Sequence, residues 1–231
     1  MPIEFEGRRV VVTGGAGALG QAVVRQLLDS GALCHVPRRQ AGDEVSRDGK
    51  LRVVGGIDLT DEVAVAAFYA GLPSLWASIH LAGGFAMAPI TDTPLADWRD
   101  QLDTNATTCF LACREAVRAF RAKGVGAGGR IVNVAARPAV EPKGGMIAYA
   151  AAKAAVASIT RCLADEVKAE RILVNAVVPS LIDTPANRAA LPHADFTRVP
   201  STDAVAEAVV WAASPSNELV SGALLPVYGT V

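Results

Sequence analysis

The sequence shows little excess of charge of either sign. Its 22 lysines and arginines nearly balance 23 aspartates and glutamates, and only 5% of the residues are aromatic. A nucleic-acid-binding surface or a segment that binds an anionic membrane needs a basic cluster, and no run of lysine and arginine occurs here. The composition therefore excludes nucleic acid as an expected partner; the small-molecule substrate that we expect follows from the motifs described below.

Cysteine is scarce, and its spacing predicts no metal centre. The four cysteines, Cys34, Cys109, Cys113 and Cys162, form no CxxC pair. Cys109 and Cys113 lie four apart and share a helix face, but no adjacent histidine or cysteine run completes a ligand set. We interpret all four as small buried side chains in a reducing compartment, and we expect no metal.

Long apolar runs and a charged-then-apolar leader pattern are also missing from the sequence. No uninterrupted apolar run reaches the length that spans a membrane. The segment 1–7 lacks the pattern of a secretory signal. We therefore expect a cytoplasmic protein with no membrane partner.

Strand and helix patterns alternate along the whole chain, which predicts one α/β domain over residues 1–231. We expect a Rossmann-type, doubly wound parallel sheet of about seven strands, with helices on both faces in three layers. The predicted strands are 8–13, 32–36, 51–55, 76–81, 130–135, 171–178 and 223–228. The predicted helices are 21–30, 61–72 with Thr60 as its cap, 95–123, 146–169 and 201–213. The stretch 180–200 is long for a loop and is predicted to be a substrate lid.

A glycine-rich turn follows the first predicted strand. Its residues are Gly14, Ala16, Gly17, Ala18, Leu19 and Gly20. Gly14 permits turn dihedrals, Gly17 or Ala18 permits a close approach of the backbone to a pyrophosphate, and Gly20 permits tight packing of the next helix. The helix N-terminus would present free N–H groups to that phosphate. The alternative is a tight strand-to-helix turn with no ligand.

The end of the second predicted strand has no carboxylate. An acid there would hold the ribose hydroxyls of NAD, whereas this strand ends in Arg38 and Arg39. Guanidinium groups suit a 2′-phosphate, so we expect NADP(H) in preference to NAD(H). The alternative is two solvated loop arginines. Further on, Asp58 is expected either to accept from the adenine amino group or to begin a turn.

Tyr149 and Lys153 lie four apart on one helix face. An ammonium group beside a phenol lowers the pKa of the phenol, which favours proton transfer near neutral pH. The alternative is a core tyrosine and a solvated lysine. Asn105 is disfavoured inside a helix, so it either faces solvent or has a specific role such as binding a water or distorting the helix.

These motifs, taken in order, resemble the short-chain dehydrogenase/reductase family. The motifs that carry the likeness are Thr13–Gly20, Asp58-Leu59, Ala82-Gly83-Gly84, Asn105, 132–134, Tyr149 with Lys153, and Pro179 with Asp183-Thr184. The resemblance implies that Tyr149 is the general acid/base, that Lys153 tunes it and binds the nicotinamide ribose, and that Asn105 holds a relay water. It also implies that Ile182 and Thr184 contact the carboxamide and phosphate, and that the protein is a homodimer or homotetramer.

One position departs from the family pattern. A serine normally stands thirteen residues before the tyrosine, and Ala136 stands there in this chain. An absent donor of this kind typically costs ~2.7–4 kcal/mol of transition-state stabilisation. Within the family, the dihydropteridine reductase branch also has alanine there, and the stretches 181–188 and 191–196 are similar to it. We therefore place Ala136 and Phe85 in the substrate pocket; Arg137 either lines it or is solvated.

Three functions follow from this reading. The first is an NADPH-dependent reductase that transfers hydride to a quinonoid pterin or a similar conjugated imine or quinone. The second is a carbonyl/alcohol oxidoreductase in which water or a group such as Asn133 replaces the serine. The third is a non-catalytic NADP(H)-binding sensor, which would need only the phosphate turn and not Tyr149, Lys153 and Asn105 together.

Overall fold

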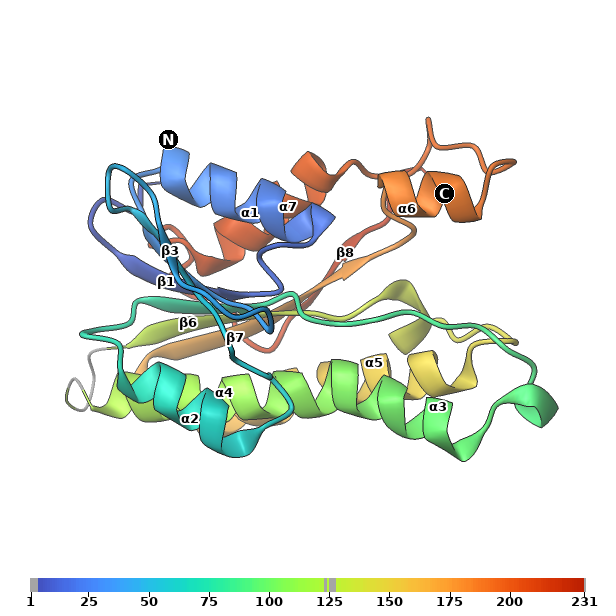
Figure 1. Cartoon of the computed structure of the whole chain (residues 1–231), viewed down its shortest axis with the longest axis horizontal. Coiled ribbons are helices and arrows are strands. Elements are labelled where there is room, and N and C mark those ends of the chain that lie inside the picture. Colours follow the sequence, from blue (N-terminus) through green and yellow to red (C-terminus); the bar gives the residue numbers. More distant parts are fainter. Residues whose placement is uncertain (1–3, 123, 125–127, 231) are drawn as a thin grey trace.

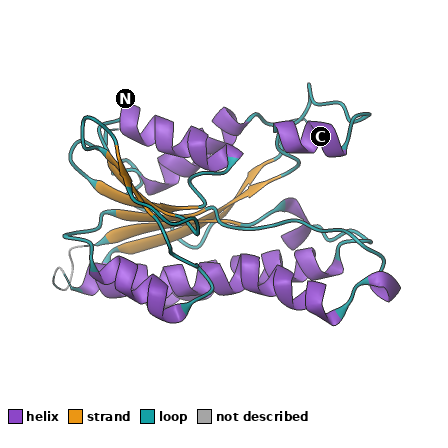
Figure 2. Cartoon of the chain, in the orientation of Figure 1, coloured by secondary structure: helices purple, strands orange, loops and turns teal. Residues whose placement is uncertain are grey.

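The structure is a computed structural model, and it describes residues 4–122, 124 and 128–230. A central sheet lies between two layers of helices (Figures 1 and 2). One layer holds α1, α6 and α7, and the other holds α2, α3, α4 and α5. The strands are β1 (Arg9–Thr13), β2 (Leu33–Pro37), β3 (Glu44–Val45), β4 (Leu51–Val54), β5 (Ala77–His80), β6 (Gly129–Val134), β7 (Ile172–Pro179) and β8 (Leu224–Val227). The helices are α1 (Ala18–Asp29), α2 (Glu62–Ala70), α3 (Leu95–Gln101), α4 (Thr108–Arg121), α5 (Ile147–Glu166), α6 (Pro185–Ala190) and α7 (Thr202–Ala213).

The sheet has eight strands in the order β3-β4-β2-β1-β5-β6-β7-β8. Every pairing is parallel except that of β3 with β4. The predicted doubly wound, three-layer fold is therefore confirmed, but the count of about seven strands was one short. The additional strand β3 lies in a stretch predicted to be loop. Its two residues are too few to show alternation, and it is joined to β4 by the turn at 46–50, in which Gly49 has a φ of +73°.

The winding of the sheet reverses direction between β1 and β5. From β1 the chain adds β2 and β4 on one side, whereas β5 to β8 extend the other side. Ligands of open α/β sheets bind outside the carboxyl ends of the strands at such a reversal. Several of the predicted site residues, including Gly14, Gly83 and Ile182, lie just after β1, β5 and β7, so the topology gathers them at one edge.

The core divides into two apolar clusters, one on each face of the sheet. Along β1, Val10 and Val12 belong to the cluster beneath α1 and α7, whereas Val11 belongs to the cluster beneath α2, α4 and α5. All three valines are fully buried. Strand residues point alternately to opposite faces, so continuous apolar strands are needed where both faces are covered.

Several helix predictions needed correction. The predicted helix 95–123 is α3, a π-helical segment η2 (Leu102–Thr107) and α4 in succession; residue 123 lies outside the described residues. The cap of α2 is Asp61, whose carboxylate accepts from the amides of Val63 and Ala64. Thr60 instead donates its hydroxyl to Asp58 at 2.8 Å.

The loops also contain short helical turns that the sequence did not predict. The predicted lid loop 180–200 contains α6. Single 3-10 turns occur at η1 (Ile90–Asp92), η3 (Arg137–Ala139) and η4 (Lys168–Glu170). The predicted glycine-rich turn at 124–129 lies partly outside the described residues. These elements are too short to show a periodic apolar pattern.

Helix α5 is long and apolar enough, by length and composition, to cross a membrane. Core helices of globular domains share these properties. Here Ala152, Lys153 and Val156 of α5 are buried against the rest of the fold. Burial of 44% of this apolar window against the fold accounts for part of the apolar composition of α5.

We predict that Gly20→Ala destabilises the protein by about 1–3 kcal/mol, because a Cβ at this position overlaps the Gly14 carbonyl oxygen and lies 2.6 Å from Gly15 Cα. Chemical denaturation measures the loss. Gly144→Ala is the matched control, since a Cβ there meets nothing within 4 Å. Equal stabilities for the two variants would contradict the packing role of Gly20.

Candidate active site

The glycine turn after β1 is shaped by contacts that leave no room for side chains. Gly14 has a φ of +70°, and a Cβ on it would come within 2.6 Å of the Ala82 backbone nitrogen. Gly17 is the N-cap of α1 and makes no side-chain cap bond. Ala16, Gly17 and Ala18 are exposed, and Leu19 is half-buried. The turn therefore forms an open cradle at a helix N-terminus, which fits the pyrophosphate of a dinucleotide.

At the end of β2, both predicted arginines have partners within the chain. Arg38 Nη2 donates to the Gly42 carbonyl at 2.9 Å and lies 2.7 Å from Glu44 Oε1. The Arg38 Nε is buried without a hydrogen-bond partner. Arg39 is 75% exposed and lies 3.2 Å from Asp58 Oδ1. Arg38 is thus the arginine held at the sheet edge, while Arg39 matches the solvated alternative more closely.

Asp58 begins a turn, as one of its two predicted roles requires. Its carboxylate accepts from the Thr60 backbone at 2.9 Å and from the Thr60 hydroxyl, and these bonds hold the pKa of Asp58 below its usual range. Leu59 is half-buried and packs against the core. A contact from Asp58 to adenine stays a prediction.

The turn after β5 is held by Asn105. The Asn105 Nδ2 donates to the Gly84 carbonyl at 3.1 Å and to the Gln101 carbonyl at 3.0 Å, and its Oδ1 accepts from the Gly84 amide at 3.2 Å. Asn105 is 1% exposed and lies in η2. It therefore distorts the helix and does not face solvent; π-helical turns frequently mark functional sites.

Lys153 is buried beneath this turn. Its Nζ donates to the Val134 carbonyl at the end of β6, at 2.9 Å, and the side chain is 6% exposed. A Cβ on Gly83 would lie 2.6 Å from Asn105 Oδ1 and 3.3 Å from Lys153 Nζ. Gly83 therefore lets the chain pass closely over both groups, and the alternative of a solvated lysine is wrong. The partner carbonyl belongs to the main chain, so no side-chain motif could have identified it.

The Tyr149 phenol does not have the predicted lowered pKa. Burial raises the pKa of Tyr149 to about 12, and burial lowers the pKa of Lys153 to about 8. The Lys153 Nζ lies 6.0 Å from the centroid of the Tyr149 ring. Desolvation disfavours the charged form of each group and outweighs their mutual influence. The spacing correctly placed both residues together but predicted the wrong direction for the phenol.

Of the three predicted pocket residues, Phe85 makes a ring contact with Tyr149. Their centroids are 4.9 Å apart at an angle of 89°, and Phe85 is 60% exposed. Ala136 is 5% exposed in extended backbone directly after β6. Arg137 instead lies against the Tyr228 ring, with 4.8 Å from its guanidinium carbon to the ring centroid, and donates to Glu141.

The residues after β7 lead into the predicted lid. Pro179 is the last residue of β7, and the half-buried Ile182 packs against the core. Thr184 is the N-cap of α6, and its hydroxyl accepts from the Asn187 amide at 3.1 Å. The hydroxyl only accepts in this bond, so its O–H remains available to donate to the cofactor phosphate that the family likeness assigns to it, and that role stays a prediction.

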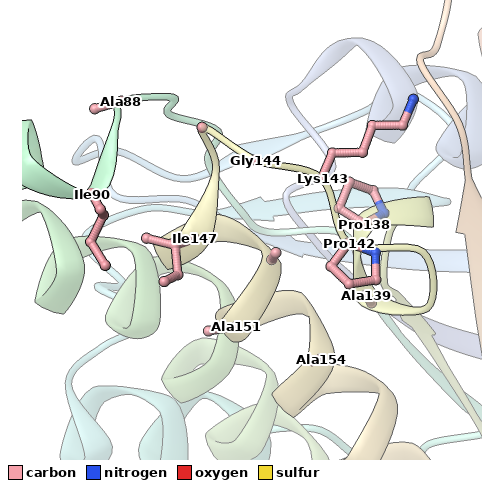
Figure 3. Close-up of a pocket in the computed structure, with 12 residues that line it drawn as sticks. Ala88, Ile90, Pro138, Ala139, Pro142, Lys143, Gly144, Ile147, Ala151 and Ala154 are labelled. Carbon is pink, nitrogen blue, oxygen red and sulfur yellow. The ribbon is translucent and has the colours of Figure 1, made fainter.

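An apolar pocket of about 520 Å³ lies beside this site, between the chain after β5, the chain after β6 and the first turns of α5 (Figure 3). It is lined by Ala88, Ile90, Pro138, Ala139, Pro142, Lys143, Gly144, Gly145, Ile147, Ala150, Ala151 and Ala154. Neither Tyr149 nor the three predicted pocket residues line it. The pocket therefore adjoins the reacting groups without containing them.

Behind the site, the structure contradicts the expectation that no histidine accompanies Cys109 and Cys113. His80 joins them, and the ligand atoms of the three buried residues lie within 4.8 Å of one another. His80 Nδ1 lies 2.7 Å from Asn133 Oδ1 and 3.5 Å from Cys113 Sγ. These contacts satisfy buried polar groups internally. Sequence spacing missed the cluster because His80 comes from β5 and the cysteines from α4. Asn133 is occupied here and does not reach the position of the missing serine.

The comparisons with known proteins agree with this arrangement. A family model described as short chain dehydrogenase matches residues 8–195. The chain belongs to the short-chain dehydrogenase/reductase family. It is an oxidoreductase of the NAD(P)-binding kind, which confirms the family that the ordered motifs indicated.

The relatives carry varied names. The cis-4-hydroxycyclohexanecarboxylate dehydrogenase of Sinomonas cyclohexanicum is 34% identical over 97% of this chain and 96% of its own length. The glucose 1-dehydrogenase of Gluconobacter oxydans is 29% identical over 97% and 92%. The crystal structure of a short chain dehydrogenase from Mycobacterium smegmatis has a TM-score of 0.81 at 27% identity, covering 98% of this chain and 95% of that one. The names of these proteins do not indicate a dihydropteridine reductase.

Burial of Lys153 predicts a pH effect on stability. The pKa of Lys153 falls from 10.5 to about 8 on folding, so between these pH values the unfolded chain binds more protons than the folded chain. The free energy of unfolding should therefore rise with pH in this window, relative to Lys153→Met, by up to about 3 kcal/mol. Denaturation of both proteins from pH 7.5 to 10 checks this. Lys168→Met, at a 71% exposed lysine, is the control that should not change the slope.

Proposed function

We propose that the protein is an NADPH-dependent reductase of a small conjugated substrate. The observation that carries the proposal is the meeting of Tyr149, Lys153 and Asn105 around the Gly83–Gly84 turn. All of these groups lie at the carboxyl edge of the sheet, where the winding reverses. A protein that only binds a nucleotide needs the phosphate turn and has no use for this buried arrangement.

The residues present fit a dinucleotide. The glycine turn leaves a space for a phosphate, and this space would be filled if the glycines carried side chains. Arg38 also has a buried Nε without a hydrogen-bond partner. The absence of a carboxylate on β2 itself supports NADP(H) in preference to NAD(H). A bound nicotinamide supplies or accepts the hydride, and the protein supplies binding and orientation.

Tyr149 is the group that could supply the proton in a reduction. With a pKa of about 12, the Tyr149 phenol holds its proton at neutral pH and can donate it to the substrate. Lys153 is fixed on the Val134 carbonyl, and Asn105 is fixed on the Gly84 turn, so neither group needs to reorganise.

The substrate class follows from Ala136 and Phe85. Ala136 offers no hydroxyl donor to an isolated oxygen that develops negative charge. Hydride addition to a quinonoid pterin, or to a similar imine or quinone, spreads the charge through a conjugated system, so a missing donor costs less. Phe85 is 60% exposed at the edge of Tyr149 and offers an aromatic surface to a planar ring.

A second candidate is a carbonyl/alcohol oxidoreductase. The name of the Sinomonas relative, a dehydrogenase of a hydroxycyclohexane carboxylate, favours it. In that case water supplies the hydrogen bond that Ala136 lacks. The third candidate, a non-catalytic NADP(H)-binding sensor, is supported only by that same missing donor. The family likeness further supports a homodimer or homotetramer, which light scattering on the purified protein tests.

The substrate proposal is tested by steady-state oxidation of NADPH and of NADH with two acceptors. One acceptor is a quinonoid dihydropterin generated in the assay, and the other is a simple activated ketone. We expect turnover of the pterin with NADPH and little turnover of the ketone. Brisk ketone reduction would favour the carbonyl reductase, and NADPH binding without turnover of either acceptor would favour the sensor.

Ala136→Ser separates the first two candidates at a single position. A hydroxyl donor at this strand end should raise ketone turnover by roughly 10²–10³-fold and change pterin turnover little. Tyr149→Phe, assayed alongside, should abolish the activity on both acceptors because it removes the donated proton. An Ala136→Ser variant with unchanged ketone turnover would show that another group already fills the serine role.

A further inference from the structure

The edge strand β3 brings a carboxylate to the arginine that we assign to the cofactor. Glu44 Oε1 lies 2.7 Å from Arg38 Nη2, and the same nitrogen donates to the Gly42 carbonyl at 2.9 Å. The side chain of Arg38 is 23% exposed, whereas that of Glu44 is 64% exposed. Arg38 is thus held from one side by a solvent-facing acid.

This ion pair faces the same hollow as the phosphate turn. Arg38 and Glu44 line a cavity of about 380 Å³ together with Gly15, Ala16 and Val36. Gly15 and Ala16 belong to the turn after β1, and Val36 belongs to β2. A ligand whose phosphates occupy the glycine turn would therefore extend towards both charges.

Main-chain contacts fix the backbone position of Glu44. Glu44 pairs with Val53 across the antiparallel β3–β4 ladder. The preceding residue, Asp43, accepts from the Gly55 amide at 3.0 Å. A Cβ on Gly55 would lie 2.5 Å from the Gly42 carbonyl oxygen, so the two chains pack closely. The hairpin fixes the backbone from which Glu44 reaches Arg38.

We propose that Glu44 is a specificity-determining residue that weakens the preference for a 2′-phosphorylated cofactor. This inference rests on the proposed use of Arg38 for a 2′-phosphate. A phosphate dianion must displace the Glu44 carboxylate from Arg38 and is repelled by it. A free ribose hydroxyl instead finds in Glu44 the acceptor that β2 lacks. Arg38 would thus bind the 2′-phosphate of NADP(H), and Glu44 would bind the free ribose hydroxyl of NAD(H), at the same place in the site.

Binding of NADP⁺ and NAD⁺ by isothermal titration calorimetry tests the inference without an assay of turnover. Glu44→Gln should tighten NADP⁺ by about 3- to 10-fold and leave NAD⁺ equal or weaker. Glu62→Gln is the matched control, because Glu62 is 66% exposed and lies 2.7 Å from Arg114, away from this cavity. It should change neither dissociation constant.

Arg38→Ala distinguishes failure of the inference from failure of the proposed cofactor. Loss of NADP⁺ affinity in Arg38→Ala, with no change of either affinity in Glu44→Gln, overturns the role of Glu44 alone. Unchanged NADP⁺ affinity in Arg38→Ala overturns the proposed 2′-phosphate site and the inference with it. Thermal unfolding of the ligand-free variants establishes that each one is folded.

Discussion

The close approach of two backbone turns governs this structure. Where β1 and β5 end side by side, the turn at Gly14 passes against the turn at Ala82, with space for a hydrogen atom and not for a methyl group. That contact fixes the positions of the two turns at the base of the candidate site. Asn105 then holds Gly84 by two hydrogen bonds, and Lys153 lies close to Gly83, so the candidate catalytic groups are positioned by the main chain that follows β5.

Much of this arrangement is local enough to predict from the sequence. Glycines between a strand and a helix specify the turn after β1, and two residues four apart on a helix specify that Tyr149 and Lys153 meet. Alternating elements specify the parallel sheet. Each of these signals lies within one short segment, where periodicity and turn chemistry operate.

The remaining features depend on segments that are distant in sequence. The pKa of Tyr149 is set by burial that a helix pattern does not reveal. Glu44 meets Arg38 because a two-residue strand pairs beside β4, and His80 of β5 meets Cys113 of α4. The Val134 carbonyl that holds Lys153 is a group every residue carries, so no residue type marks it.

The π-helical segment η2 changes the direction in which side chains point along the helical region from α3 to α4. A π turn holds more residues than an α turn, and each α-helical residue advances the side-chain direction by roughly 100°. The segment η2 therefore resets the angular register between α3 and α4, which run on as one rod. It lets α4 direct its apolar face to the core while Asn105 points towards the Gly83–Gly84 turn after β5. The π-helical segment thus allows Asn105 and the apolar face of α4 to point in two directions that a regular α-helix could not combine.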